Sequence, residues 1–477
     1  MFKNNIYNTV LLCSFALFAT ACSTPVLVQQ NKGQTIPDTF HNSSDSNTVA
    51  SLKWNSYFND PNLLVLIDSA LHNNQEFNIT MLEIQIAKNE VRAKKGEYLP
   101  SIGLKASAGV EKTARYTPFG ANEATTEIEP GREMPEPVPD FMIGAVASWE
   151  VDIWHRLRNA KKSAVMEYLA SVEGKNFMQT NLVAEIASSY YELLAQDNQL
   201  AIVKQNIAIQ KNALNIVEQQ KNAAIVTELA VQKFQAEVLK NRSRQFYIEQ
   251  QIIELENKIN FLVGRFPQTI KRSSIPLLDL PIDSISVGIP SQMLANRPDI
   301  KQAELELEAA KLDVKVARAR FYPSLGISSS IGLQAFDPSY LAKTPESLLY
   351  SLAGDLISPL VNRNAIKAAY SSANVKQIQA LYEYEKTVLS AYLEVVNNLS
   401  KIKNLNKSFD LKNQEVQTLN KSIRVSTDLF KSARADYMEV LMTQRDALES
   451  TVELIETKMQ QMNTRVMMYK ALGGGWN

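Results

Sequence analysis

Glycine and proline are almost absent from two long stretches of this 477-residue chain, although it holds 16 Gly and 18 Pro. Neither occurs between Leu360 and Leu472, and between Ala145 and Val263 the only one is Gly174. Compact globular domains turn every dozen residues or so, and Gly and Pro together make up roughly 12% of an average sequence. The two stretches therefore argue against a compact enzyme fold and predict very long helices.

The chain also has no excess of one charge and only three histidines. The 50 Lys and Arg balance the 50 Asp and Glu, so the basic excess of a nucleic-acid-binding protein is lacking and we expect no nucleic-acid partner. The three histidines, His41, His72 and His155, lie in unrelated segments, and the sequence shows neither a nucleotide-binding glycine loop nor clustered metal ligands. We therefore expect no enzyme activity, no metal and no dissociable cofactor.

Cysteine occurs only twice, at Cys13 and Cys22. A positively charged start is followed by the apolar run Thr9–Phe18, which has the length of a secretory signal and is too short to span a membrane. The small residues Ala-Thr-Ala directly before Cys22 resemble a bacterial lipobox. We predict a signal peptide at residues 1–21 and a covalent lipid, with acyl chains such as palmitate, on Cys22. A plain signal peptide followed by an incidental cysteine is the alternative.

Cleavage at that point leaves Cys22 as the only cysteine of the mature chain. Disulfides, thiolate zinc sites and cysteine nucleophiles are then excluded. Ser23 is compatible with release to the outer membrane, since it is not the Asp that commonly retains lipoproteins at the inner membrane. Residues 22–50 are rich in Ser, Thr, Asn, Gln and Pro, which predicts a lipidated N-terminus with an extended tether.

An internal repeat organises the rest of the chain. The motif from Ala87 to Gly103 recurs from Ala310 to Gly326, and the motif from Arg158 to Lys162 recurs from Arg363 to Lys367. The first copy is longer because of a Pro-rich insert at 116–140. Fixed flanks around an insert of variable length predict a β-hairpin with a loop of free length. Each copy is thus expected to contain helix, strand, loop, strand and long helix.

The strands are predicted from residues that alternate in polarity. The period of two is clear in Ser101–Glu111 and Phe141–Ile153, and weaker in Ser324–Ala335 and Leu348–Ser358. Segments of about ten residues, apolar on one side and small or polar on the other, are what a transmembrane barrel strand requires. A hairpin on a soluble helical domain explains any one of them alone, but two such hairpins in a secreted lipoprotein favour the membrane.

Both stretches with almost no Gly or Pro carry a 3.5-residue apolar repeat, from Leu182 to Val217 and from Val388 to Ile423. This repeat predicts coiled-coil packing, in which the Gln and Asn of the stripe set the register or are partly solvated rather than bind a ligand. A single helix across the second stretch would be roughly 170 Å long, so each stretch must reverse near its middle. Thr227 and Asp436 are the candidate caps after the reversals.

The predicted organisation beyond the tether is two copies of one unit. It comprises a first repeat at 51–264, with its β-hairpin at about 101–153 and its helical tip near 222–228; a Pro-containing connector at 265–289; a second repeat at 290–472, with its β-hairpin at about 324–358 and its tip near 431–437; and a Gly-rich tail at 473–477.

Several motifs resemble those of TolC-like outer-membrane efflux proteins, in particular their NodT-type lipoprotein branch. The most specific run begins with Leu294-x-x-Arg297-Pro298-Asp299-Ile300 and ends with Phe321-Tyr322-Pro323-Ser324-Leu325. Further matches lie at Trp54–Leu63, Ser148–Arg158 and Tyr469–Trp476. Together these motifs cover nearly all of the mature chain in the order found in the family.

The resemblance implies a mainly helical fold with a transmembrane β-barrel portion. Family members are homotrimers in which each protomer gives four strands to a 12-stranded barrel and its helices to a periplasmic coiled-coil α-barrel. They are exit ducts of tripartite exporters, docked to a periplasmic adaptor and an inner-membrane pump, often of the RND type. The resemblance thus implies an outer-membrane channel that passively conducts small molecules such as drugs or other toxic compounds. The number of strands agrees with a trimer. At four strands per chain, two chains would close an eight-stranded barrel that side chains fill, whereas three chains leave a lumen.

The resemblance also points to a gate at the periplasmic tip, where relatives carry rings of acidic side chains. By motif, Glu439 falls on one such position, Asp436 lies beside it, and Arg445 matches a basic residue near the constriction of some relatives. The second usual acid, three residues after Glu439, is Met442 here. A purely structural role for Glu439, as part of the helix cap at Asp436, stays open.

Two other functions compete with a small-molecule duct. A lipid-anchored coiled-coil scaffold without a pore accounts for the long helices and the tether but not for the duplicated β-hairpins. A duct for protein or metal export would share the same wall. The sequence names neither the cargo nor the pump and adaptor.

Overall fold

The computed structural model describes residues 37, 39–40, 48–49, 52–273, 275–282, 286–432 and 434–476. The predicted signal peptide, Cys22 and most of the expected tether lie outside the described residues. The described residues fall into two compact units. One contains Ile86–Tyr168 and Leu305–Leu381, and the other contains the residues up to Gln85, Leu169–Glu304 and those from Tyr382 onward.

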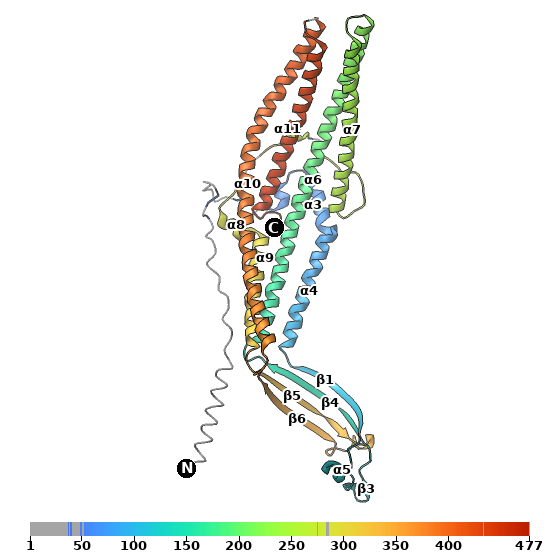
Figure 1. Ribbon diagram of the computed structural model, residues 1–477, viewed down its shortest axis with the longest axis vertical. Helices are drawn as coiled ribbons and strands as arrows, with labels where there is room; N and C mark the ends of the chain where they lie inside the picture. Colours follow the sequence, from blue (N-terminus) through green and yellow to red (C-terminus); the bar gives the residue numbers. More distant parts are fainter. Residues whose placement is uncertain are drawn as a thin grey trace. The chain divides into compact units, whose positions relative to one another are not determined.

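The elements follow the predicted duplication (Figure 1). In the first copy they are α2 (Trp54–Tyr57), α3 (Pro61–Asn73), α4 (Gln75–Glu97), β1 (Ser101–Glu111), α5 (Pro118–Glu123), β2 (Glu127–Glu129), β3 (Arg132–Glu133), β4 (Val138–Val151), α6 (Arg156–Asn222) and α7 (Glu228–Leu262). After a short 3-10 turn, η2 (Leu277–Asp279), the second copy contains α8 (Pro290–Asn296), α9 (Pro298–Ala319), β5 (Ser324–Ala335), η3 (Pro338–Tyr340), β6 (Leu348–Ile357), α10 (Asn364–Lys431) and α11 (Tyr437–Ala471).

The long helices occupy the two stretches with almost no Gly or Pro, and Gly174 lies within α6. α6 has 67 residues and α10 has 68, while α7 and α11 have 35 each, so the two copies match in length. α6 forms a hairpin with α7, and α10 forms one with α11 (Figure 1). The mainly helical fold with duplicated strand pairs is as expected. In the described part of the chain, no helix combines the length and apolarity needed to cross a membrane.

The apolar stripe of α6 is buried as the heptad pattern predicts. Leu182, Ile186, Leu193, Val203 and Val217 are all at most 3% exposed. They belong to clusters built with α3, α7 and α11, and the largest of these clusters also takes in Leu277 of the connector. Burial of this stripe, rather than intrinsic helix propensity, stabilises helices of such length.

A second cluster of the same unit includes Phe40, from the segment expected to be a tether. Phe40 is fully buried, stacks on Tyr392 at 5.5 Å between ring centroids, and packs with Val388 and Val395 of α10. Nearby, the backbone N–H of Val49 donates to the carbonyl of Ser286. At these points the N-terminal segment is docked on the folded unit.

The other unit contains a four-stranded antiparallel sheet in the order β1-β4-β5-β6 (Figure 1). The pairing of β4 with β5 joins the two copies of the repeat. The Pro-rich insert, expected as a hairpin loop of free length, contains α5 and the small β2–β3 pair. Two local signals produce this structure. Thr117, directly before Pro118, caps α5, and its side chain accepts a hydrogen bond from the N–H of Gly120. Gly131 has a positive φ of 84° at the turn between β2 and β3.

Candidate functional site

One face of the four-stranded sheet is apolar and open to the surroundings. The register places apolar residues of neighbouring strands directly opposite one another, for example Leu104, Ala145, Ile331 and Tyr350 in one row. On this face Leu104 is 91% exposed, and Tyr350 77%. Soluble proteins rarely expose so continuous an apolar surface, which therefore marks contact with a partner or a membrane.

The other face of the sheet is lined mainly by small and polar residues, with five larger apolar side chains among them. Its residues are Ser101, Gly103, Lys105, Ser107, Gly109 and Glu111 of β1; Val138, Asp140, Met142, Gly144, Val146, Ser148 and Glu150 of β4; Ser324, Gly326, Ser328, Ser330, Gly332 and Gln334 of β5; and Leu349, Ser351, Ala353, Asp355 and Ile357 of β6. Serine hydroxyls interact across the strands, with 2.7 Å between the Oγ atoms of Ser330 and Ser351. Such a face suits contact with water rather than with lipid.

The dimensions of the sheet fit a membrane. A strand of eleven residues, such as β1, spans roughly 36 Å, which a tilt of 35–45° reduces to about 25–30 Å along the membrane normal. Aromatic side chains gather where the strands meet the helices. Trp149 donates from Nε1 to the carbonyl of Tyr98, and Trp154 donates to that of Pro323 while stacking on Tyr322 at 4.7 Å. Aromatic girdles of this kind flank the apolar band of outer-membrane barrels.

β1 and β6 are the two edges of the sheet, since each pairs on one side only within the described chain. An open edge presents unpaired N–H and C=O groups, which water cannot satisfy inside a bilayer. Each of these two edges therefore needs a further partner strand wherever the sheet meets lipid.

The predicted gate residues lie at the turn between α10 and α11. Asp436 is the N-cap of α11, and its carboxylate accepts a hydrogen bond from the N–H of Met438 at 3.4 Å. Glu439 is exposed in the first turn and lines a groove of about 560 Å³ between α10 and α11. Arg445 contacts the carboxylate of Asp446 at 3.3 Å and lines a different groove.

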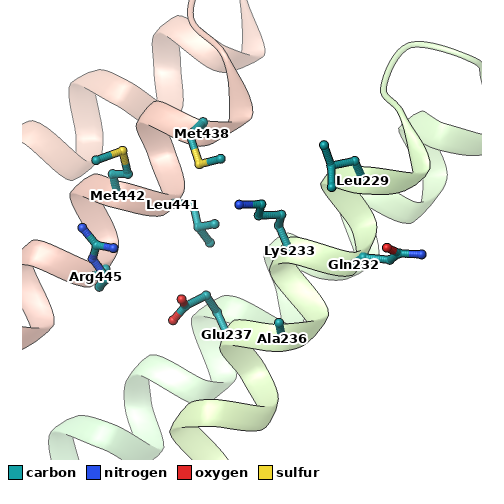
Figure 2. A pocket seen from close by; sticks show the side chains of 9 residues that line it. All are labelled: Leu229, Gln232, Lys233, Ala236, Glu237, Met438, Leu441, Met442 and Arg445. Atoms are coloured by element: carbon teal, nitrogen blue, oxygen red, sulfur yellow. The ribbon is translucent and has the colours of Figure 1, made fainter.

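Figure 2 shows that second groove, of about 460 Å³, between α7 and α11. Its apolar lining includes Leu229 and Leu441, and Lys233 and Glu237 of α7 face Arg445 across it (Figure 2). The structure thus places Asp436 and Glu439 together but Arg445 on another side of α11. The spacing explains this, since six residues at 100° each separate Glu439 from Arg445 by about 120° around the helix.

Sequence reasoning did not single out Lys233 and Glu237, because charged residues on a long helix carry no motif. It also missed the pairing of Gly144 with Gly332 on the polar face of the sheet. Lys105 was visible as a member of the polar set of β1 but carried no further signal. Among the residues the structure describes, no group of three or more His, Cys, Asp or Glu side chains is arranged to hold a metal ion.

A two-faced antiparallel sheet with open edges, in a chain that also forms two long helical hairpins, defines a channel protein of the outer-membrane type. The sequence profile described as "Outer membrane efflux protein" matches residues 66–265 and 289–474. The chain belongs to the outer membrane efflux protein family and is an outer-membrane protein.

Relatives within the family support this assignment. The pyoverdine export outer membrane protein OpmQ of Pseudomonas aeruginosa is 27% identical over 424 residues, or 89% of this chain and 87% of OpmQ. The solvent efflux pump outer membrane protein SrpC of Pseudomonas putida is 25% identical over 437 residues, covering 91% of this chain and 90% of SrpC. The open-state structure of the MtrE outer membrane channel of Neisseria gonorrhoeae shares the fold, with a TM-score of 0.83 at 22% identity over 95% of this chain and 99% of MtrE.

Proposed function

We propose that three copies of this chain form the exit duct of a tripartite efflux system. Each copy contributes β1, β4, β5 and β6 to a twelve-stranded barrel, in which β6 of one copy pairs with β1 of the next. The apolar face meets lipid and the polar face lines a water-filled lumen. The observation that carries the proposal is the two-faced sheet with two open edges.

Exposed apolar residues on the helices support the same assembly. Ile79, Leu82 and Ile86 of α4 follow helical spacing and are 55%, 62% and 68% exposed. On α7, Phe246 and Ile253 lie seven residues apart and are 62% and 51% exposed. Stripes of this kind at heptad spacing pack against further helices, here those of a neighbouring copy.

The duct opens toward a periplasmic adaptor that docks at the helical tips, and an inner-membrane pump, of the RND type, supplies the energy. The lipid on Cys22 adds an anchor in the outer membrane. The cargo consists of small molecules such as drugs or other toxic compounds. The names of relatives include both pyoverdine and solvent export, so the wall of the duct alone does not select one cargo.

The test of the assembly uses the purified full-length protein. We expect a heat-labile trimer that resists SDS at room temperature and forms ion-conducting channels in planar bilayers. A monomer, or a trimer without conductance, would reject the duct and favour the pore-less coiled-coil scaffold.

In the assembled duct, Asp436 and Glu439 form acidic rings at the constricted tip, with Arg445 close to the constriction. Three copies of each carboxylate in one ring raise the local negative potential. Both acids are exposed in or next to the first turn of α11, which supports a role beyond capping.

The double variant Asp436→Asn and Glu439→Gln tests the gate. Asn is as good an N-cap as Asp, so the variant removes charge while keeping the start of α11 intact. We expect a higher single-channel conductance or an altered ion selectivity. The control is Asp410→Asn, at an exposed position of α10. Traces identical to those of the wild type would reject the gate assignment.

A further inference from the structure

Lys105 is the only Lys or Arg in the four strands of the sheet. It lies on the polar face of β1, where the register pairs it with Gly144 of β4; Gly144 in turn pairs with Gly332 of β5, and Gly332 with Leu349 of β6. In this row of the polar face, Lys105 therefore has a glycine as its neighbour and a second glycine beyond it.

The two glycines are required by the backbone. A Cβ on Gly144 would lie 2.6 Å from the carbonyl oxygen of Ile331, and a Cβ on Gly332 would lie 2.5 Å from that of Ile143. No side chain fits at those distances, so β4 and β5 close in on each other at this row. The row of Lys105 is consequently bare, and no side chain stands directly opposite the ammonium group on β4 or β5.

The remaining charges of the polar face are acidic and distant from Lys105. Within one copy, Asp140 lies four residues along β4 from the row of Lys105, roughly 13 Å at 3.3 Å per residue. Glu111 on β1, Glu150 on β4 and Asp355 on β6 each lie six residues from that row, roughly 20 Å. All of these separations exceed the screening length of about 8 Å at physiological salt. Lys105 is exposed, and within the described part of the chain no ion pair involves it.

A lysine within a barrel strand is tolerated on the lumen side, whereas on the lipid side it would destabilise the inserted barrel. We propose that the three Lys105 side chains of the trimer form a cationic ring inside the barrel that binds small anions and carboxylate-bearing cargo. The ring lies between two acidic levels of the wall, so it sets the anion permeability of the barrel. This inference rests on the proposed trimeric duct.

The test compares channels of the wild type, Lys105→Gln, Lys105→Glu and Lys105→Arg in planar bilayers under a potassium chloride gradient. The ratio of chloride to potassium permeability should fall about twofold or more in Lys105→Gln and further in Lys105→Glu, while Lys105→Arg keeps the wild-type ratio. The shift should be larger at low salt because the field of the ring is then less screened. The matched control is Lys112→Gln, just beyond β1, where the native lysine pairs with Glu136 at 3.5 Å.

Citrate supplies a second readout as a carboxylate probe. Added to one side, it should block the wild-type current transiently, and Lys105→Gln should need a severalfold higher concentration for the same block. An unchanged permeability ratio together with unchanged citrate block in Lys105→Gln would overturn the cationic ring. Wild-type trimers that conduct no current would instead reject the duct itself, so the two failures are distinguishable.

Discussion

At the scale of single residues, Asp152 connects the sheet to the helices. Its side chain is 2% exposed and accepts hydrogen bonds from the N–H groups of Leu157 at 2.9 Å and Arg158 at 3.0 Å, and from Nε of Arg158 at 3.2 Å. These bonds satisfy free N–H groups at the start of α6. Burial by itself raises the pKa of Asp152, but the hydrogen bonds and the guanidinium outweigh it and hold the pKa below the ordinary 3.8.

Replacing Asp152 by Asn should destabilise the protein by about 1–3 kcal/mol at neutral pH, because the buried donors lose their charged acceptor. A carboxyl whose pKa is lowered on folding stabilises the fold above its unfolded pKa, and that contribution is lost as the pH falls through the folded pKa. The difference from the wild type should therefore shrink below a pH of about 4. Thermal unfolding of both proteins, followed by circular dichroism at neutral pH and below a pH of about 4, measures this difference in stability.

The control for Asp152→Asn is Asp410→Asn, which removes the same charge at an exposed site of α10 and should leave the melting temperature unchanged. Equal melting temperatures of wild type and Asp152→Asn at neutral pH would contradict the capping role.

Single residues also show where prediction from sequence stops. The alternation in β1 places Lys105 on the polar side without any structure. The need for Gly144 and Gly332 depends on β4 pairing with β5, which lies in the other copy of the repeat. No local pattern reports that approach, so the bare row beside Lys105 becomes visible only in three dimensions.

At the scale of elements, a buried amide pair fixes the register of α6 against α7. The Nδ2 of Asn241 donates to the Oε1 of Gln210 at 2.9 Å, and the two residues are 3% and 1% exposed. Gln210 lies in the stripe that predicted coiled-coil packing, and its pairing supports a register-setting role. Polar pairs in such stripes trade stability for a single alignment of the helices.

Asn241→Leu alone should destabilise the hairpin by about 1–3 kcal/mol, because the amide of Gln210 is left buried without this partner. The double variant Gln210→Leu and Asn241→Leu should return to within about 1 kcal/mol of the wild type, since no polar group is then stranded. Melting temperatures of the wild type, both single variants and the double variant measure the coupling. Additive losses in the double variant would show that the two amides act independently.

The turn between α6 and α7 contains a strained alanine. Ala224 adopts a positive φ of 55°, a left-handed conformation that favours glycine, and its side chain is exposed. Ala224→Gly should raise the stability by about 0.5–1 kcal/mol. Glycine relieves the strain of the left-handed conformation, and its greater freedom in the unfolded chain offsets only part of that gain. Its neighbour Ala223 ends the helix with a hydrogen bond to the carbonyl of Gln219, so Ala223→Gly should lower the stability. Shifts of the same sign in both variants would contradict this account.

Elements with a long repeating pattern were predictable and short ones were not. The absence of Gly and Pro between Leu360 and Leu472 removes every strong helix breaker, so α10 and α11 could be expected. α5 and the β2–β3 pair have too few residues to show a period, and local capping and a single glycine turn define them. The docking of Phe40 depends on contacts with α10 that composition does not reveal.

At the scale of the whole molecule, membrane attachment has two sources in the proposed duct. One is the apolar face of the sheet, and the other is the lipid on Cys22. The segment from Cys22 to Phe40 can extend at most roughly 60 Å, at 3.3–3.6 Å per residue. Because Phe40 is itself buried against α10, the contacts of the folded body do not depend on the lipid.

Replacing Cys22 by Ser should therefore abolish lipid attachment while leaving the trimer intact. Strand pairing between copies and packing of the exposed helix stripes provide the association, whereas the acyl chains contact membrane lipid and add no contact between copies. Labelling with radioactive palmitate followed by SDS electrophoresis without heating measures both properties in one sample. Ser23→Ala is the matched control, which should keep the label. A Cys22→Ser protein that runs as a monomer would show that the lipid, rather than the strands and helices, holds the assembly together.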